Sequence, residues 1–395
     1  MHEWKRVRLG EVADEVTVGH VGPMVDEYHL SGVPFLRSQN VLPHRIDLSD
    51  IKFIDRDFHS KLKKSALRPG DVVTVRTGKP GTTAVVPDSL AEANCSDLVI
   101  TRPGPALDAQ WLSYYVNVAA SDYVSAHLVG AVQQHFNVGA AKNMVLHLPP
   151  LNEQQAIAEV LGALDYKIAA NTELATTADG LAGLVFDHAV DGAPYKAMSS
   201  TLMPVLGGTP ARARSEYWGG DRLWASAKDI TGAPFGVVIA TQECITAEAV
   251  SQTKAKPLPK GSVILTARGT VGAVARLGSP SSLNQSCYGF VPDVLPAGVL
   301  YFSILRATDR AKAFAHGSVF DTITTRTFDH LEVVDMPASE LRRVEGRVGP
   351  LLAKVEQSVR ENESLAAMRD ALLPLLMSGK IRVRDAEQMV GMWSE

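Results

Sequence analysis

The sequence predicts an α/β (α+β) fold in which two duplicated mixed α/β units are separated by two long antiparallel coiled-coil helices and related by a pseudo-twofold axis. Three observations predict this fold. Apolar residues recur at coiled-coil spacing in two long stretches, strand-like runs precede each stretch, and the second half of the chain repeats the first. The predicted domains are residues 1–150, 151–190, 197–337 and 338–380.

The central stretch, 151–190, is predicted to be one helix. Pro149 and Pro150 precede it, and Asn152 is a suitable N-cap. At ~1.5 Å per residue, a helix of about 38 residues is roughly 57 Å long. Its large apolar side chains follow steps of four and three residues, with Asn171 filling one step: Ile157, Leu161, Leu164, Ile168, Leu174, Leu181 and Leu184. Such a stripe needs a partner helix.

The predicted partner is the stretch 338–377 of the same chain. Its beginning matches the central helix at an offset of 187 residues (Pro150 with Pro337), and its later part at 191 (Asn171 with Asn362). The difference is about one helical turn, so the stripe continues through a stutter. In an antiparallel pair the two asparagines would lie close together and could fix the register. The predicted helix-contact residues are Ile157, Leu161, Leu164, Ile168, Asn171, Val348, Val355, Val359, Asn362 and Leu372.

The units that precede the two helices share a scaffold. Runs at 33–36, 71–75 and 97–100 are typical of strands, and 111–129 has helical spacing. Three glycines recur at the 191 offset, which requires a turn into a strand and a tight loop out of it in both units. The matched pairs are Gly70 with Gly261, Gly78 with Gly269 and Gly81 with Gly272.

Composition limits the class of protein. The 395 residues are 46% hydrophobic, which is sufficient for two or three domains with real cores. Three widely separated cysteines provide neither a disulfide framework nor a metal-binding pair. The charged N-terminus is unlike a signal peptide, and no apolar run approaches the ~18 residues of a membrane span. We expect a cytoplasmic chain with no metal and no membrane contact.

The net charge of −4 argues against a generally basic, nonspecific nucleic-acid binder, but the charge distribution favours DNA. Residues 249–292 contain five basic and no acidic residues, and residues 51–80 contain eight basic residues against three aspartates. A solvated face could produce either patch alone. Because the patches occupy matching places in the two repeats, they favour contact with a DNA backbone.

Catalytic signatures are absent from the sequence. Thr77-Gly78-Lys79-Pro80 resembles a phosphate loop, but the earlier glycine is missing and proline replaces the magnesium-binding Ser or Thr. The sequence therefore predicts no catalytic residue and no cofactor. A hydrolase using Asp321 and His135 is disfavoured because the repeats preserve no acid–base pair. A purely structural coiled-coil adaptor would not need two elaborate units.

The alternation of unit and helix resembles the specificity (S) subunit of type I restriction–modification systems over nearly the whole chain. The residues that carry the resemblance are the segments 148–157 and 365–381, and Gly207-Gly208-Thr209-Pro210 with 216–221 and 228–230. At 338–341, Ala-Ser-Glu-Leu replaces the usual proline and Glu-Gln-Gln wording. The spacing of the helix is unaffected by this departure.

The resemblance implies a non-catalytic reader of double-stranded DNA. Each target-recognition domain would read half of a split site in the major groove, and two methyltransferase subunits carrying S-adenosylmethionine would methylate adenine. A restriction subunit is a further potential partner, and the alternative is a related system with a fused methylase–nuclease. We expect recognition surfaces ~10 base pairs apart and an unread spacer of roughly 5–8 base pairs, which a turn added to either helix would lengthen.

The predicted DNA-contact residues belong to polar loops and basic patches that recur in the two repeats. In the first unit they are Arg37, Ser38, Asn40, Arg76, Lys79, Gln133, Gln134, His135 and Asn137. In the second unit they are Arg212, Arg214, Lys228, Arg268, Thr322, Thr324 and Arg326.

Overall fold

The computed structural model describes residues 4–129, 135–314 and 322–393 of the chain. Its contacts divide the chain into two compact units. Unit 1 comprises Met1–Tyr166 with Leu365–Glu395, and unit 2 comprises Lys167–Ser364. Each unit contains sheets and part of both long helices. No helix in the described part of the chain is long and apolar enough to cross a membrane.

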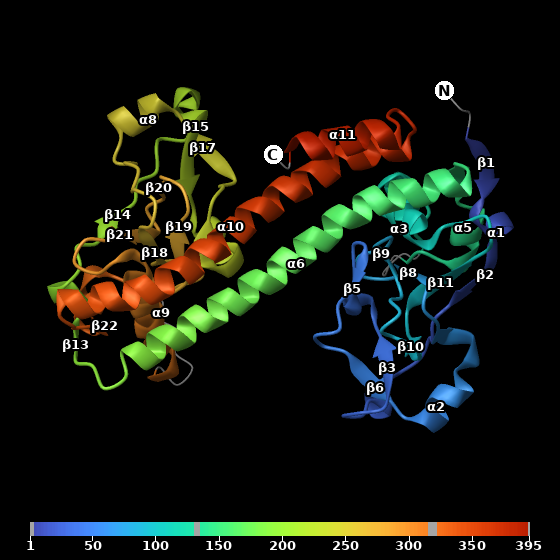
Figure 1. Ribbon diagram of the computed structural model, residues 1–395, viewed down its shortest axis with the longest axis horizontal. Helices are drawn as coiled ribbons and strands as arrows, with labels where there is room; N and C mark the ends of the chain where they lie inside the picture. Colours follow the sequence, from blue (N-terminus) through green and yellow to red (C-terminus); the bar gives the residue numbers. More distant parts are fainter. Residues whose placement is uncertain (1–3, 130–134, 315–321, 394–395) are drawn as a thin grey trace. The chain divides into compact units, whose positions relative to one another are not determined.

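Both predicted long helices are confirmed as α6 (Leu151–Ala189) and α10 (Ala338–Met377), each of which is one uninterrupted element (Figure 1). Within unit 2, Lys167 pairs with Glu361 at 3.2 Å, and Ala175 and Ala178 pack in one cluster with Val355 and Val359. Residue numbers therefore fall along α10 as they rise along α6. The helices are antiparallel.

The buried stripe of α6 differs from the prediction in its second half. Leu174, Leu181 and Leu184 are 41%, 47% and 69% exposed, so their assignment to the stripe was wrong. The four-and-three spacing continues instead through small residues, which place the larger leucines off the buried face. The buried residues of α6 include Ile157, Leu161, Leu164, Asn171, Ala175, Ala178, Ala182 and Phe186, while Ile168 is half-buried. Those of α10 include Val348, Val355, Val359 and Leu372, with Asn362 half-buried.

Unit 1 contains two four-stranded sheets. One has the order β6-β3-β10-β7, made of β3 (Val33–Leu36), β6 (Lys52–Ile54), β7 (Ala66–Leu67) and β10 (Ala93–Cys95). The other has the order β2-β11-β8-β9, made of β2 (Ala13–Val18), β8 (Val72–Val75), β9 (Thr83–Val85) and β11 (Leu98–Pro103). Two antiparallel pairs complete it: β1 (Lys5–Arg8) with β12 (Val145–Leu148), and β4 (Val41–Leu42) with β5 (Arg45–Ile46). The three predicted strands are thus confirmed.

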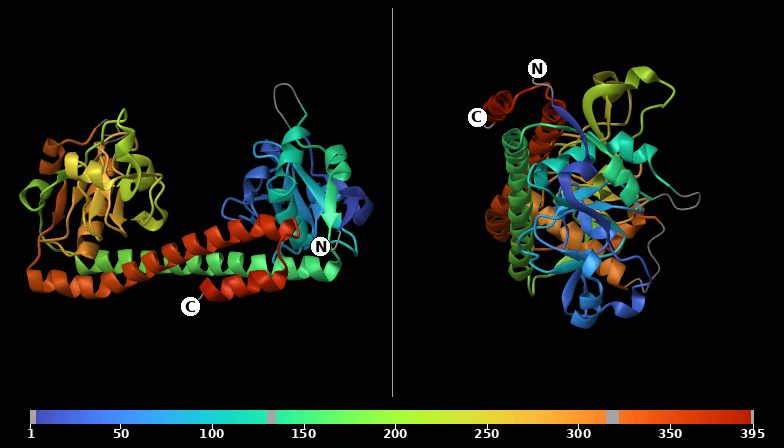
Figure 2. Two further views of the ribbon diagram at one scale, coloured as in Figure 1. Left: turned by 90° about the horizontal axis from the view of Figure 1, so that it is seen from above. Right: turned by 90° about the vertical axis from the view of Figure 1, so that its right-hand side faces the viewer.

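The helices of unit 1 are α1 (Leu9–Val12), α2 (Arg56–Lys61), α3 (Ala109–Val118), α4 (Ser121–Ala126), α5 (Val138–Asn143) and α11 (Val383–Trp393). They pack on two cores: α2 packs through Phe58 beside Phe35 and Ile54, and the others pack on a core shared with the long helices. The stretch 111–129 is therefore two helices and not one, because the chain turns at Ala120, whose N–H bonds to the Tyr115 carbonyl. Helix α11 turns back from the end of α10 and buries Ala386 in the same core (Figure 2).

Unit 2 repeats this plan with a five-stranded sheet of order β14-β21-β18-β19-β16 and a three-stranded sheet of order β17-β15-β20. Their strands are β14 (Val205–Leu206), β15 (Trp218–Ala225), β16 (Val237–Val238), β17 (Glu243–Ile245), β18 (Val263–Thr266), β19 (Val274–Leu277), β20 (Ser282–Leu283) and β21 (Cys287–Phe290). The pair β13 (Tyr195–Ala197) and β22 (Glu332–Val334) and the helices α7 (Ala227–Thr231), α8 (Ala247–Gln252) and α9 (Ala297–Phe314) complete the unit.

The duplication extends to the backbone. The parallel pair β3–β10 sets Leu36 opposite Cys95, and the parallel pair β15–β20 sets Ala225 opposite Leu283. All six matched glycines have φ between +78° and +93°, the left-handed region that favours glycine: Gly70, Gly78, Gly81, Gly261, Gly269 and Gly272. The predicted turn and tight loop are therefore confirmed in both units.

Candidate nucleic-acid interface

In unit 1, three segments that are distant in sequence meet around Arg76. The Phe136 N–H donates to the Arg76 carbonyl at 3.0 Å, and the Arg76 N–H donates to the Asp97 carbonyl at 3.3 Å. The Ser38 hydroxyl donates to that same Asp97 carbonyl at 3.4 Å. These bonds place the loop after β8 beside the segments around Ser38 and Phe136, as the predicted contact surface requires.

The side chains on this surface differ in their freedom to meet DNA. Lys79 is exposed on the tight loop, and His135 is half-buried. The Arg76 guanidinium lies 3.6 Å from the Asp97 carboxylate, so its charge is already balanced. Asn137 caps α5 by accepting the Ala140 N–H at 2.8 Å. Gln133 and Gln134 lie outside the described residues.

Asn40 does not belong to this surface. Its side chain is 2% exposed, accepts the Arg37 N–H at 3.0 Å and donates to the Asp47 carbonyl at 3.1 Å. The prediction that Asn40 faces DNA is therefore wrong, because both the oxygen and the nitrogen of its side-chain amide form hydrogen bonds within the hairpin. Its exposed neighbour Gln39, which donates to Asp50 at 2.9 Å, was missed and is the better placed amide.

Arg37 stays near this surface but is paired. Its guanidinium lies 3.0 Å from the Asp50 carboxylate, which Lys52 also contacts at 3.0 Å. These two cations lower the pKa of Asp50 through hydrogen bonds from Lys52 first and then Arg37. Contact with a base or phosphate would require Arg37 to exchange this partner.

Unit 2 repeats the arrangement around Ala267. The Ile323 N–H donates to the Ala267 carbonyl at 3.0 Å, as Phe136 does to Arg76 in unit 1. Arg268 is exposed on the adjoining loop, and the neighbouring segment presents three further exposed residues, Thr322, Thr324 and Arg326. The predicted residues Arg268 and 322–326 thus lie together.

Arg212, Arg214 and Lys228 belong to other parts of unit 2. Arg212 lies 3.8 Å over the Trp218 ring, and its Nη2 is 2.8 Å from Glu243 Oε2. The hydrogen bonds from Arg212 lower the pKa of the Glu243 carboxyl. Arg214 donates to the Tyr217 hydroxyl at 2.7 Å, while Lys228 is exposed on α7. These arginines surround the three-stranded sheet, whereas Arg268 follows β18 of the five-stranded sheet.

The predicted basic patch of residues 249–292 is weaker in the structure than in the sequence. Arg276 is 8% exposed and its Nη1 donates to the Leu352 carbonyl at 2.9 Å. Burial lowers the pKa of Arg276. Lys260 pairs with Glu356 at 2.6 Å. Both residues attach unit 2 sheets to α10 and are not free to meet a DNA backbone.

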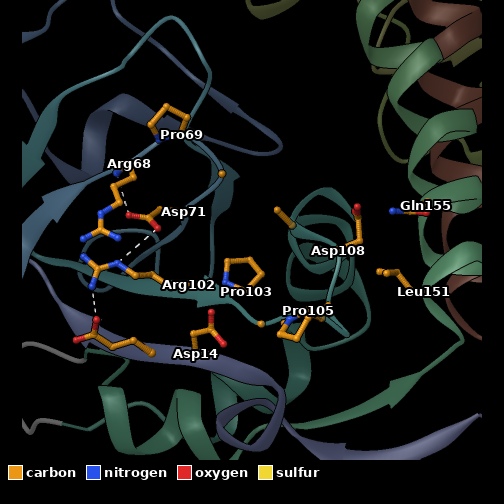
Figure 3. A pocket seen from close by; sticks show the side chains of 15 residues that line it. Asp14, Arg68, Pro69, Asp71, Arg102, Pro103, Pro105, Asp108, Leu151 and Gln155 are labelled. Carbon is orange, nitrogen blue, oxygen red and sulfur yellow. Dashed lines mark hydrogen bonds and ion pairs between the residues drawn. The ribbon is translucent and has the colours of Figure 1, made fainter.

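A cavity of about 700 Å³ in unit 1 carries charges of both signs (Figure 3). Arg102 pairs with Glu15 and lies 3.6 Å from Asp71, which also accepts the Arg68 N–H at 3.0 Å. Burial raises the pKa of Asp71. The charges of Arg102, Glu15 and Asp71 therefore compensate one another within the cavity. Among the described residues, no group of three His, Cys, Asp or Glu could hold a metal ion.

The family model of the type I restriction modification DNA specificity domain matches residues 1–177 and 207–337. The chain belongs to this family. The description of the family is a DNA specificity domain, so the match supports a role in DNA sequence recognition. The double match also agrees with the two repeated units of the fold.

Two curated relatives are named specificity subunits of type I restriction enzymes. The MjaIX specificity subunit of Methanocaldococcus jannaschii is 27% identical over 162 residues, which is 40% of this chain and 38% of that protein. The HindI specificity subunit of Haemophilus influenzae is 27% identical over 195 residues, 48% of this chain and 42% of that protein. The matches thus span less than half of either relative.

The S subunit of the type I restriction–modification system from M. genitalium superposes with a TM-score of 0.64 at 15% identity. The superposition covers 94% of this chain and 96% of that one. The specificity-subunit fold is therefore shared along nearly the full length.

Proposed function

We propose that the chain recognises a bipartite DNA site, with each unit reading one half-site and an unread spacer between them. The observation that supports this proposal is a duplicated backbone with different polar side chains. The glycine loop carries Arg76 and Lys79 in unit 1 but Arg268 in unit 2, and its neighbouring segment carries His135 in unit 1 but Thr324 in unit 2. One scaffold with two sets of side chains is suited to reading two different base sequences.

Phosphate contacts would provide affinity, and base contacts would provide sequence specificity. Exposed cations such as Lys79 and Arg268 would neutralise phosphates, which gives affinity without sequence preference. Base contacts would come from the adjoining residues: His135 and the predicted Gln133 and Gln134 in unit 1, and Thr324 and Arg326 in unit 2. Arg37 and Arg212 are held by carboxylates, and exchange of these partners for DNA acceptors would make their contacts selective.

The reaction directed by this recognition would be adenine methylation by partner subunits. Two methyltransferase subunits would supply S-adenosylmethionine, and a restriction subunit would add cleavage. The alternative partner is a fused methylase–nuclease. In either case this chain would bind no cofactor of its own.

The test is co-expression with the methyltransferase subunit of the same restriction–modification system, followed by genome-wide mapping of methylated adenines. We expect a motif of two short half-sites separated by a spacer of fixed length. A continuous motif, or an unchanged methylation pattern when this chain is omitted, would contradict the proposal. The composition of the purified complex distinguishes separate methyltransferase subunits from a fused methylase–nuclease.

A further inference from the structure

Two turns at equivalent places in the repeats share an unusual backbone. His44, between β4 and β5, has φ of +66°, and Phe235, before β16, has φ of +50°. The two residues are separated by the repeat offset of 191. Non-glycine residues rarely adopt this left-handed conformation. Its occurrence at both positions indicates that each turn must direct its side chain to a particular place.

In unit 1 the turn is joined to both long helices through Tyr114 of α3. The His44 ring contacts the Tyr114 ring in a tilted arrangement with centroids 4.4 Å apart, and its Nδ1 lies 3.3 Å from the Asn117 amide. The Tyr114 hydroxyl donates to Asp165 of α6 at 2.5 Å, and Asp165 pairs with Arg369 of α10 at 2.7 Å. One carboxylate therefore joins the turn's tyrosine to both helices.

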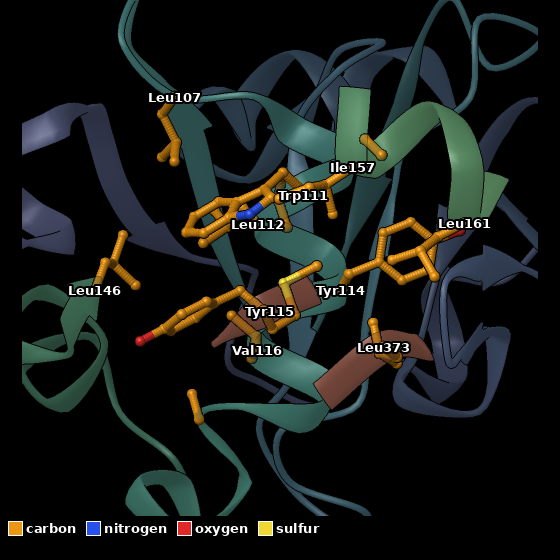
Figure 4. Close-up of a cluster of buried hydrophobic side chains, with 14 of the residues drawn as sticks. Leu107, Trp111, Leu112, Tyr114, Tyr115, Val116, Leu146, Ile157, Leu161 and Leu373 are labelled. Carbon is orange, nitrogen blue, oxygen red and sulfur yellow. The ribbon is translucent and has the colours of Figure 1, made fainter. Parts of the chain in front are cut away.

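Tyr114 is buried in the core of unit 1. Figure 4 shows Tyr114 in the unit 1 core together with Leu161 of α6 and Leu373 of α10. The His44 N–H also donates to the Thr83 carbonyl of β9 at 3.0 Å. The turn is thus held by β9 on one side and by α3 on the other, and Tyr114 of α3 connects it to the long helices.

In unit 2 the equivalent turn reaches the long helices by apolar contact. Phe235 packs against a cluster that includes Ala178 of α6 and Val355 of α10. Tyr301, which matches Tyr114 at an offset of 187, lies beside this turn. A Cβ added to Gly236 would approach its hydroxyl to 2.7 Å. Turn and tyrosine are repeated, but the contact chemistry differs.

The turn of unit 1 belongs to the same hairpin as candidate DNA-contact residues. Within the segment 37–50, the Asn40 amide fastens Arg37 to Asp47, and Arg37 pairs with Asp50. This segment is therefore one hydrogen-bonded element, with the turn against α3 and with Arg37 and Ser38 at its base. In unit 2, Asp229 replaces Asn40 and accepts from the Ser226 N–H at 2.8 Å and the Gln242 N–H at 2.9 Å.

We propose that His44 is a positioning residue for the first half-site and that Phe235 is its counterpart for the second. Each turn anchors its segment to the long helices, through Tyr114 in unit 1 and through apolar contact in unit 2, and thereby sets where the adjoining polar residues meet DNA. His44 itself contacts no base. This role rests on the proposed function, in which each unit reads one half-site.

The experiment measures binding of the full chain, in complex with its methyltransferase, to three duplexes. One carries the mapped site, one a mismatch in the first half-site, and one a mismatch in the second. His44→Ala should reduce discrimination against the first mismatch by about fivefold or more, from the ordinary range of roughly 10-fold to 100-fold, and leave the second unchanged. Phe235→Ala should do the reverse. His44→Phe, which copies unit 2, should retain most of the discrimination.

Unchanged discrimination by a folded His44→Ala complex would overturn the role, and so would equal loss at both half-sites, which indicates general damage. If alanine prevents folding, Tyr114→Phe is decisive, because it keeps the ring and removes only the hydroxyl that holds Asp165. Tyr114→Phe should show the same loss of discrimination at the first half-site alone. A Tyr114→Phe complex without that loss would refute the positioning role. If the wild-type complex recognises no split site, the proposed function is refuted together with the positioning role. If the wild-type complex recognises a split site but the variants lose no discrimination at a single half-site, only the positioning role is refuted.

Discussion

The Asp165 carboxylate on α6 lies 2.7 Å from the Arg369 guanidinium on α10 and also accepts the Tyr114 hydroxyl of α3. The side chains of Asp165 and Arg369 are only 25% and 22% exposed. Burial and the neighbouring carboxylate raise the pKa of Tyr114, which keeps its hydroxyl as the donor. One carboxylate thus connects three helices of unit 1.

Arg369→Ala should lower the free energy of unfolding by about 1–3 kcal/mol, because it leaves the partly buried Asp165 charge without its ion-pair partner. Urea denaturation measures this loss. Lys167→Ala is the matched control, since its pair with Glu361 is more exposed, at 52% and 38%, and should contribute ~0–1 kcal/mol. Equal losses for the two variants would contradict the assigned difference.

The stability of unit 1 should depend on pH through His44. Burial lowers the pKa of His44 to about 4, although Asp165 partly opposes this shift. An unfolded histidine has a pKa of about 6.5. As pH falls from 6.5 toward 4, the unfolded chain therefore binds a proton that the folded chain excludes, and stability decreases by up to about 3 kcal/mol. Unfolding measured at pH 7.5 and 4.5 should show a smaller decrease for His44→Phe. Identical decreases would refute this role of His44.

The two seam asparagines should respond differently to substitution. Asn362 Nδ2 donates to the Ile168 carbonyl at 3.2 Å and to the Thr172 hydroxyl at 3.1 Å. Within the described part of the chain, the buried Asn171 Nδ2 has no hydrogen-bond partner. Asn171→Leu should therefore raise the free energy of unfolding by about 1 kcal/mol, because it removes an unsatisfied polar group. Asn362→Leu should lower it by a similar amount. Thermal denaturation measures the stability of the two variants. A less stable Asn171→Leu chain together with a more stable Asn362→Leu chain would contradict this assignment.

Phosphate contacts and base contacts should separate in binding measurements. Lys79→Ala and Arg268→Ala should weaken binding to every duplex and reduce the salt slope by about 1 each. Arg326→Ala should cost about 1–3 kcal/mol at one base position only. Lys380→Ala, an exposed cation beyond α10, is the control and should change neither quantity. If Arg76, Gln133 and Gln134 changed together to alanine leave site binding intact, the proposed unit 1 surface is wrong.

The sequence was sufficient for features set by local chemistry. Gly78 and Gly269 need the same left-handed backbone wherever they occur, and the spacing of Ile157 and Leu161 needs a helix. The partners of individual side chains could not be predicted in this way, because they depend on which distant segments the tertiary fold brings together. Arg369 pairs with a carboxylate 204 residues away, and the environment that buries Asn40 is formed by a hairpin that the residue type does not specify.

The same limit explains the error on α6. Large apolar residues were assigned to the buried stripe, yet the helices approach each other over Ala175 and Ala178, which leaves Leu174 exposed. Alanine carries too little apolar area to identify a seam by composition. The unbroken four-and-three spacing was the signal that could have found it.

The long helices should set the spacer of the recognised site without setting its half-sites. Seven residues inserted into both α6 and α10, after Lys167 and before Leu365, keep the heptad spacing of the seam and add about 10 Å of helix at ~1.5 Å per residue. At ~3.4 Å per base pair this corresponds to a spacer longer by about 3 base pairs. Both half-sites should stay the same, because neither helix carries a predicted base contact. A two-residue insertion is the control, since at 3.6 residues per turn it rotates the buried stripe by about 200°, away from its partner, and should destabilise the pair. Methylation mapping measures both variants, and altered half-sites in the seven-residue variant would overturn the proposed division between recognition and spacing.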